Sequence, residues 1–243
     1  AVLRRSEDGF VDELFAAAPL HGAPLIRALF PRVFIDPNRE PYELDPAMFA
    51  DPLPPFVNVR SPRVGAGLGT IARVVANGAE VYFSKLPFAE AQRRVETFYR
   101  PYHARLAALI EDTADMYGGS VLIDCHSMPS VGGPMDLDPG KRRVDFVLGD
   151  CHGTSCAPSL IDAVERHLRD RGHSVARNNP YAGGFCTQHY GRPRLRRHAL
   201  QIEINRALYM DEARIEKAPQ FGALAREMTE LVDTIVRAAK ELV

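Results

Sequence analysis

The fold is decided by a short apolar run that ends in polar side chains, Ser120-Val121-Leu122-Ile123-Asp124-Cys125-His126. Its length and its β-branched residues predict a β-strand. Gly118-Gly119 stands directly before it and predicts the end of a preceding helix. That helix is expected over 89–117, where apolar side chains recur on one face at Val95, Phe98, Tyr99, Tyr102, Leu106 and Ile110.

Strands and helices alternate after this run. The segments 144–149 and 198–205 are predicted strands, and 158–171 and 221–242 are predicted helices. This alternation indicates an α/β protein, a single domain over 1–243 whose sheet has helices on both faces. Such sheets bind ligands at the carboxyl ends of their strands. Two turn-rich stretches, 36–62 and 128–143, predict long loops, which often carry function.

Composition is that of an ordinary globular protein in the cytoplasm. The 243 residues are 46% hydrophobic and 25% charged, with a net charge of −1, so no nucleic-acid partner is expected. No apolar run reaches the roughly 20 residues of a membrane span, so no membrane is expected either. The first residues lack the apolar segment of a signal peptide. The four cysteines form no CxxC pair and predict free thiols in a reducing compartment.

Asp124 and His126 are the first candidates for chemistry. Because side chains alternate along a strand, both project from the same face at its carboxyl end. The imidazole suits the role of a metal ligand. The neighbouring carboxylate can orient it by a hydrogen bond to the ring nitrogen that does not bind the metal. A structural histidine held by hydrogen bonds explains the same pattern equally well. Cys125 points to the opposite face, so a catalytic pair of Cys125 and His126 is not expected.

Glu203 lies in the middle of an otherwise apolar strand, with Gln201 and Asn205 on its own face. A buried carboxylate without a partner costs several kcal/mol, so this side chain requires a cation or a solvated cleft. In a cleft it can act as the general base on water. The strand alone slightly favours a structural ion pair with an arginine such as Arg206 or Arg39.

Two loop segments offer contacts to a substrate. Asn38 and Arg39 carry amide and guanidinium donors for a carboxylate, although a salt bridge that pins the loop is the simpler explanation. Gly183 and Gly184 predict a turn, and a glycine pair also lets the backbone approach a ligand closely. Gly65-x-Gly67-x-Gly69 lacks the spacing of a nucleotide-binding fingerprint. A GxSxG sequence, typical of one class of serine hydrolase, is absent.

An ordered set of short segments covers nearly the whole chain: Ser6-Glu7-Asp8-Gly9-Phe10-Val11-Asp12-Glu13-Leu14, Ile35-Asp36-Pro37-Asn38-Arg39, Tyr99-Arg100-Pro101-Tyr102-His103, Ile123-Asp124-Cys125-His126-Ser127-Met128, Asn179-Pro180-Tyr181-Ala182-Gly183-Gly184, His189-Tyr190-Gly191 and Gln201-Ile202-Glu203-Ile204-Asn205-Arg206. In this order the segments resemble the N-formylglutamate amidohydrolase family. Each segment is weak alone, and the ordered set is specific. The resemblance implies the fold of the zinc carboxypeptidases and aspartoacylases, with a mixed, mostly parallel sheet that has helices on both faces.

The resemblance also implies one zinc ion and a role for each matching residue. His126 and Asp8, with Glu7 as the alternative to Asp8, are implied as metal ligands, and Glu203 as the residue that activates water. The family's early Pro-His-Ser-Gly segment, which carries its first metal ligand, has no counterpart in the sequence. Because the later motifs are intact, we expect that the sequence is shortened at its N-terminus.

The implied substrate is acidic and small. Asn38 and Arg39 are implied to bind its carboxylate, and Gly183 and Gly184 to line its site. A second carboxylate needs a second cation, for which the candidates are Arg73, Arg192 and Arg194. The implied reaction converts N-formyl-L-glutamate to formate and L-glutamate. The alternatives are a zinc hydrolase for another N-acyl amino acid or a peptide, and a non-catalytic α/β protein that binds an acidic small molecule.

Overall fold

The computed structural model describes residues 2–75, 78–133, 136 and 138–243. The chain forms two compact units. The first contains the residues up to Glu7 and Ala28–Ala107, and the second contains Asp8–Arg27 and Ala108–Val243. The expected single domain over 1–243 stays a prediction. In the expected loop 128–143, Pro134 and positions 135 and 137 lie outside the described residues.

The first unit combines loops with most of a long helix. Residues 88–117 are helical throughout, as α3 (Phe88–Arg94), a π-helical turn (Val95–Tyr99) and α4 (Arg100–Tyr117), which confirms the helix predicted over 89–117. The expected loop 36–62 contains one 3-10 turn (Pro46–Met48) and leads into α2 (Pro62–Gly65), and another 3-10 turn spans Val2–Ser6. The buried side chains of this unit include Leu44, Met48, Phe49, Val57, Ile71, Phe88 and Ala91.

The second unit is built on a sheet whose described strands run in the order β1-β4-β2-β3. Their bounds are β1 (Ser120–Met128), β2 (Phe146–Gly149), β3 (Val175–Arg177) and β4 (Arg197–Asn205). β1 pairs with β4 and β2 with β3 in parallel, while β2 and β4 are antiparallel. The expected α/β class with a mixed, mostly parallel sheet is therefore confirmed.

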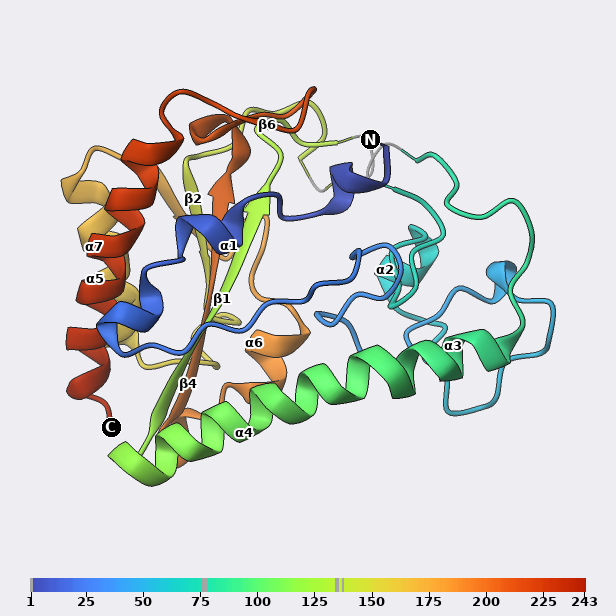
Figure 1. Ribbon diagram of the computed structural model, residues 1–243, viewed down its shortest axis with the longest axis horizontal. Coiled ribbons are helices and arrows are strands. Elements are labelled where there is room, and N and C mark those ends of the chain that lie inside the picture. Colours follow the sequence, from blue (N-terminus) through green and yellow to red (C-terminus); the bar gives the residue numbers. More distant parts are fainter. Residues whose placement is uncertain (1, 76–77, 134–135, 137) are drawn as a thin grey trace. The chain divides into compact units, whose positions relative to one another are not determined.

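The two faces of this sheet differ in chemistry. One face is apolar, and α5 (Pro158–Asp170), α7 (Phe221–Lys240) and the short α1 (Val11–Leu14) supply side chains to the core against it. The other face carries polar residues and contacts α6 (Phe185–Tyr190). Figure 1 shows α5 and α7 on one side of the strands and α6 on the other. The polar face is therefore where chemistry can take place.

Short elements complete the second unit. They are 3-10 turns at Ala18–His21, Pro193–Leu195 and Arg206–Leu208, and the strand pair β5 (Met210–Asp211) and β6 (Glu216–Lys217). In the described part of the chain, no helix is both long enough and apolar enough to span a bilayer.

Candidate active site

The register of β1 and β4 brings the two main candidates together. His126 is the pairing partner of Glu203, and Asp124 is the partner of Gln201. Neighbouring strands lie about 4.8 Å apart, and partners in register project from the same face. The proposed metal ligand and the proposed base are therefore adjacent, at the carboxyl-terminal half of both strands.

His126 is held at both ring nitrogens. Its Nδ1 lies 3.0 Å from Asp8 Oδ2, and its Nε2 lies 2.8 Å from Asp124 Oδ1. Thr187 Oγ1, on α6, donates to the other oxygen of Asp124 at 3.0 Å. Burial lowers the pKa of His126, but the two carboxylates outweigh it and raise that pKa well above its usual value. The ring orientation is thus fixed from two sides.

Asp8 is positioned by the end of β1, although it lies far from it in the sequence. Its Oδ1 accepts from the backbone nitrogen of Ser127 at 2.8 Å and from the Ser127 hydroxyl at 3.0 Å. Arg206 Nη2 lies 3.9 Å from the same oxygen, and Arg206 Nε donates to Ser127 Oγ at 3.1 Å. Glu7, the other acidic candidate, pairs with Arg4 at 3.5 Å. Asp8 is thus an acidic candidate with a direct contact to His126.

Glu203 is bound by a neighbour on its own strand. Gln201 Nε2 donates to Glu203 Oε1 at 2.9 Å, and both side chains are buried. The third polar residue of this face, Asn205, donates to the carbonyls of Arg143 and Val144 and caps the turn that follows β4. Asn205 is thus structural.

Gly183 and Gly184 lie where a loop crosses the polar face of the sheet. A Cβ on Gly149 would lie 2.7 Å from the carbonyl carbon of Ala182 and 2.8 Å from the nitrogen of Gly183, so the loop backbone packs directly on β2. Gly183 has a φ of +136°, which disfavours any side chain there. Gly184 N–H donates to Gln201 Oε1 at 2.6 Å. The glycine pair therefore serves close packing of the backbone beside Glu203.

Tyr181 lies in the same loop as Gly183 and Gly184, where it contacts the buried side chain of Arg143. The guanidinium of Arg143 lies 5.1 Å from the centre of the Tyr181 ring. Asp136 and Asp138 each lie 2.7 Å from Arg143 Nη2. Burial raises the pKa of Tyr181 to about 12, with the charge of Glu203 acting in the same direction. Tyr181 is thus a neutral phenol near the proposed base.

Asn38 and Arg39 belong to the first unit, where both are largely buried. Arg39 Nε donates to the carbonyl of Leu68 at 3.2 Å and Nη1 to the carbonyl of Asn38 at 3.0 Å. Asp36 lies 3.7 Å from Arg39 Nε, so a contact that pins the loop is present. Burial lowers the pKa of Arg39 to about 10, and Asp36 opposes this shift. A partly desolvated guanidinium of this kind binds carboxylates strongly.

The other candidate arginines differ in their surroundings. Arg73 Nε donates to Asp45 at 2.7 Å, and Glu80 lies 3.8 Å from Arg73 Nη1. Arg192 donates to the carbonyls of Gln188 and Gly191 at 2.8 Å each. Arg194 lies exposed on a 3-10 turn. Among these three, Arg73 alone has carboxylate partners within the described residues.

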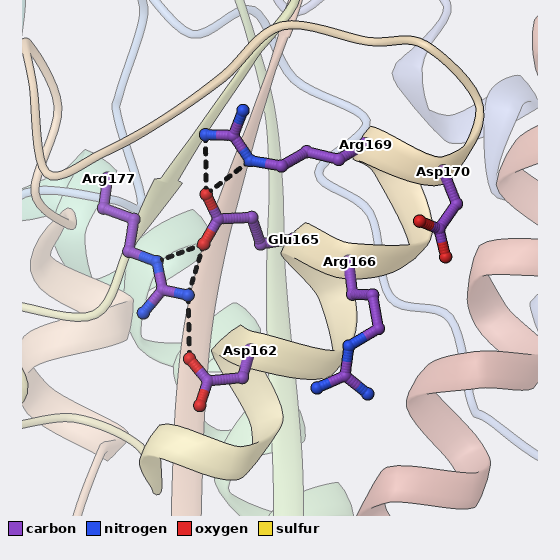
Figure 2. Close-up of a pocket in the computed structure, with 6 residues that line it drawn as sticks. All are labelled: Asp162, Glu165, Arg166, Arg169, Asp170 and Arg177. Carbon is purple, nitrogen blue, oxygen red and sulfur yellow. Dashed lines mark hydrogen bonds and ion pairs between the residues drawn. The ribbon is translucent and has the colours of Figure 1, made fainter.

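A depression of about 420 Å³ on α5 contains none of these candidates. Figure 2 shows its lining of charged side chains, in which Glu165 is paired with Arg169 and Arg177. Arg177 also binds Asp162, at 2.8 Å. Exposed ion pairs of this kind contribute little stability and leave no desolvated surface for a ligand. We therefore interpret this depression as a solvated surface network.

Comparison with known proteins identifies the family. The sequence model of the N-formylglutamate amidohydrolase family matches residues 1–210. The chain belongs to the N-formylglutamate amidohydrolase family. The crystal structure of the N-formylglutamate amidohydrolase from Ralstonia eutropha JMP134 is similar to it, with 40% identity and a TM-score of 0.91, over 99% of this chain and 86% of that one. The resemblance found in the sequence is thus confirmed.

Two bacterial N-formylglutamate deformylases are also similar to this amidohydrolase. The enzyme of Pseudomonas putida is 30% identical over 84% of this chain and 71% of its own length. That of Pseudomonas aeruginosa is 29% identical over 92% of this chain and 80% of its own length. As a member of this family, the amidohydrolase is a hydrolase that acts on an amide bond.

The side chains around His126 include donors of the types that zinc binds. Within the described ranges, no group of three or more His, Cys, Asp or Glu side chains is arranged to hold a metal ion. Asp8 and His126 nonetheless form a converging oxygen and nitrogen pair, the donor types that catalytic zinc takes. Asp124 binds the far nitrogen of His126, as carboxylates do behind zinc-bound histidines. These residues therefore fit two positions of a zinc site.

Proposed function

We propose that the protein hydrolyses N-formyl-L-glutamate to formate and L-glutamate, with zinc as its cofactor. The observation that carries the proposal is the register of β1 and β4, which sets the His126–Asp8 pair beside Glu203. A pair of zinc-type donors next to a buried carboxylate suits hydrolysis of an amide by activated water. The names of the similar proteins support the same substrate.

Asp8 and His126 would hold the zinc ion, and Asp124 would keep the imidazole in the required orientation. When bound, zinc supplies Lewis-acid chemistry, because it polarises a carbonyl and acidifies water. Ser127 keeps Asp8 in place through its backbone nitrogen and its hydroxyl. The described residues thus contribute two ligands and the contacts that orient them.

Glu203 would act as the general base and then as the general acid. It takes a proton from water while the water oxygen bonds to the formyl carbon. It returns that proton to the glutamate nitrogen as the carbon–nitrogen bond breaks. The remaining acidic proton passes from formic acid to the free amine, which leaves formate and L-glutamate. One carboxylate in contact with the substrate serves both transfers.

Arg39, with Asn38, would bind the α-carboxylate of the substrate, and the Gly183-Gly184 backbone would line the site. Arg73 is proposed for the side-chain carboxylate, with Arg192 and Arg194 as the alternatives. Family resemblance carries the assignment of Asn38 and Arg39, and the burial of Arg39 supports it. The need for a second cation, and not the resemblance, leads to the other arginines. Two carboxylate contacts would distinguish glutamate from neutral amino acids.

Formate release and metal content, measured on the same preparation, test the proposal. N-formyl-L-glutamate should release formate, and removal of the metal by a chelator should abolish release until zinc returns. N-acetyl-L-glutamate and a formylated dipeptide should react much more slowly. Faster hydrolysis of either compound, followed as released acetate or formate respectively, would assign the enzyme another acyl group or a peptide substrate, and full activity without metal would exclude the zinc mechanism.

A further inference from the structure

Gln201 is a buried polar residue to which neither the sequence patterns nor the proposed reaction assign a role. It lies two residues before Glu203 on β4 and is 4% exposed. Its Nε2 donates to Glu203 Oε1 at 2.9 Å, and its Oε1 accepts from the Gly184 backbone nitrogen at 2.6 Å. Each end of the amide therefore has a defined partner, and both hydrogen bonds are buried.

The Gly184 backbone decides which way round the Gln201 amide stands. A peptide N–H can only donate, so the atom that faces Gly184 must be the amide oxygen. The amide nitrogen then faces Glu203 and donates a hydrogen bond to Oε1 of its carboxylate. A flipped amide would set two donors against each other at one end and two acceptors at the other.

The loop that supplies this N–H is itself fixed to the sheet. Ala182 O accepts from the backbone nitrogen of Cys151 at 2.7 Å. The absence of a side chain at Gly149 lets the loop lie directly on β2. The orientation of Gln201 therefore follows from backbone contacts, which a single side-chain rotation cannot change.

We infer that Gln201 is a positioning residue that fixes the orientation of the Glu203 carboxylate through Oε1. The inference rests on the proposed function, in which Glu203 is the base. The amide that donates to Oε1 is itself oriented by the Gly184 N–H, so the contact opposes rotation of the carboxylate. Glu203 is thus held in one orientation for both proton transfers.

A double-mutant cycle tests the inference, because it separates action through Glu203 from general support of the fold. The proteins are the intact enzyme, Gln201→Met, Glu203→Gln and the double variant, each assayed for kcat and KM with N-formyl-L-glutamate. Methionine matches glutamine in length and removes both hydrogen bonds. Gln201→Met should lower kcat at least about tenfold, with KM changed less than about twofold. In the Glu203→Gln background the same change should alter kcat less than about twofold.

An equal loss of kcat in both backgrounds would overturn the inference, because Gln201 would then act independently of Glu203. Unchanged kcat in Gln201→Met would overturn it as well. Gln220→Met, an exposed glutamine on the same unit, is the matched control and should retain full kcat. If the intact enzyme releases no formate, the proposed function is refuted. This result differs from an equal loss of kcat in both backgrounds and from an unchanged kcat in Gln201→Met.

A second variant covers the case in which Gln201→Met does not fold. Gln201→Glu keeps the shape and the acceptor for Gly184 N–H but replaces the donor to Glu203 with a carboxylate. Two carboxylates buried side by side should lower its Tm, so it is assayed at pH 8 below that Tm, where its kcat should fall at least as far as that of Gln201→Met. A kcat near the original value would show that only the contact to Gly184 matters, and would overturn the inference.

Discussion

His126 and Glu203 are register partners in a parallel pair of strands, so they project from one face of the sheet on neighbouring strands. Their proposed roles are separable by experiment, because one would bind the metal and the other would move a proton. A loss of metal and a loss of turnover are different measurements. The first two predictions use this difference.

Replacement of His126 by Ala should remove the metal. The imidazole is one of the two donors in the described residues that fit zinc, and the loss of a protein ligand weakens binding by orders of magnitude. Zinc per protein, measured by elemental analysis after dialysis, should fall at least about tenfold. His167→Ala, on α5, is the control and should retain its zinc. Normal zinc content in His126→Ala would place the metal elsewhere.

Replacement of Glu203 by Gln should leave the metal bound and stop the chemistry. The amide cannot take the proton of the attacking water, so kcat should fall at least about a hundredfold. Zinc content and KM should stay close to those of the intact enzyme. Turnover within a few-fold of normal would show that another residue is the base.

Replacement of Arg39 by Lys should weaken binding of the substrate carboxylate. Lysine cannot reproduce the planar two-point contact of a guanidinium, so KM for N-formyl-L-glutamate should rise at least tenfold, about 1.4 kcal/mol. A substrate whose α-carboxylate is an amide should be affected much less, because the contact is then absent in both proteins. Equal effects on the two substrates would mean that Arg39 only pins the loop through Asp36.

The four cysteines should all be titratable thiols in unfolded, unreduced protein. The structure has Cys125, Cys151, Cys156 and Cys186 as free cysteines. Burial raises the pKa of Cys125 and Cys151, and that of Cys156 to about 12, so these thiols should react slowly in the folded protein at pH 8. A titre of two or none after unfolding would contradict the expected reducing compartment.

Replacement of Gly149 by Ala should destabilise the second unit. The new Cβ would lie 2.7–2.8 Å from backbone atoms of Ala182 and Gly183, which cannot move aside as a flexible side chain can. We expect a loss of about 1–3 kcal/mol in the free energy of unfolding, measured by denaturant titration. Gly222→Ala on α7 is the control, because a Cβ there meets only the tip of Arg226, 3.9 Å away. Equal stability of the two variants would argue against close packing at β2.

The spacing of apolar residues, together with glycines at the ends of elements, predicted the long helices and strands of the fold. The glycine pair before Ser120 and the apolar run after it predicted β1, and the structure extends that strand by two residues to Met128. β3 and α6 were missed because three and six residues are too few for a periodic pattern. The predicted strand 144–149 begins two residues later, at Phe146.

The candidate site was predictable only where it follows from a strand. Alternation of side chains along the strand predicted that Asp124 and His126 share one face, and the register shows that Glu203 adjoins them. The contact of Asp8 with His126 joins residues 118 positions apart, so family resemblance was its sole indication. The position of Gln201 beside Glu203 was visible in the sequence, but its second partner is a backbone N–H, which no side-chain pattern reveals.

The order of the strands in the sheet determines which strand edges are unpaired while the chain is being synthesised on the ribosome. Among the strands of the main sheet, β4 comes last in the sequence, yet it lies between β1 and β2. While β4 is still unsynthesised, the edges of β1 and β2 that it will cover lack their backbone partners, and sheets assembled from distant segments form slowly. A nascent chain that already contains Asp8 and His126 therefore exposes open strand edges, which are prone to pair with other chains. Synthesis of the strand that carries Glu203 allows those edges to close and the proposed catalytic face to form in one event.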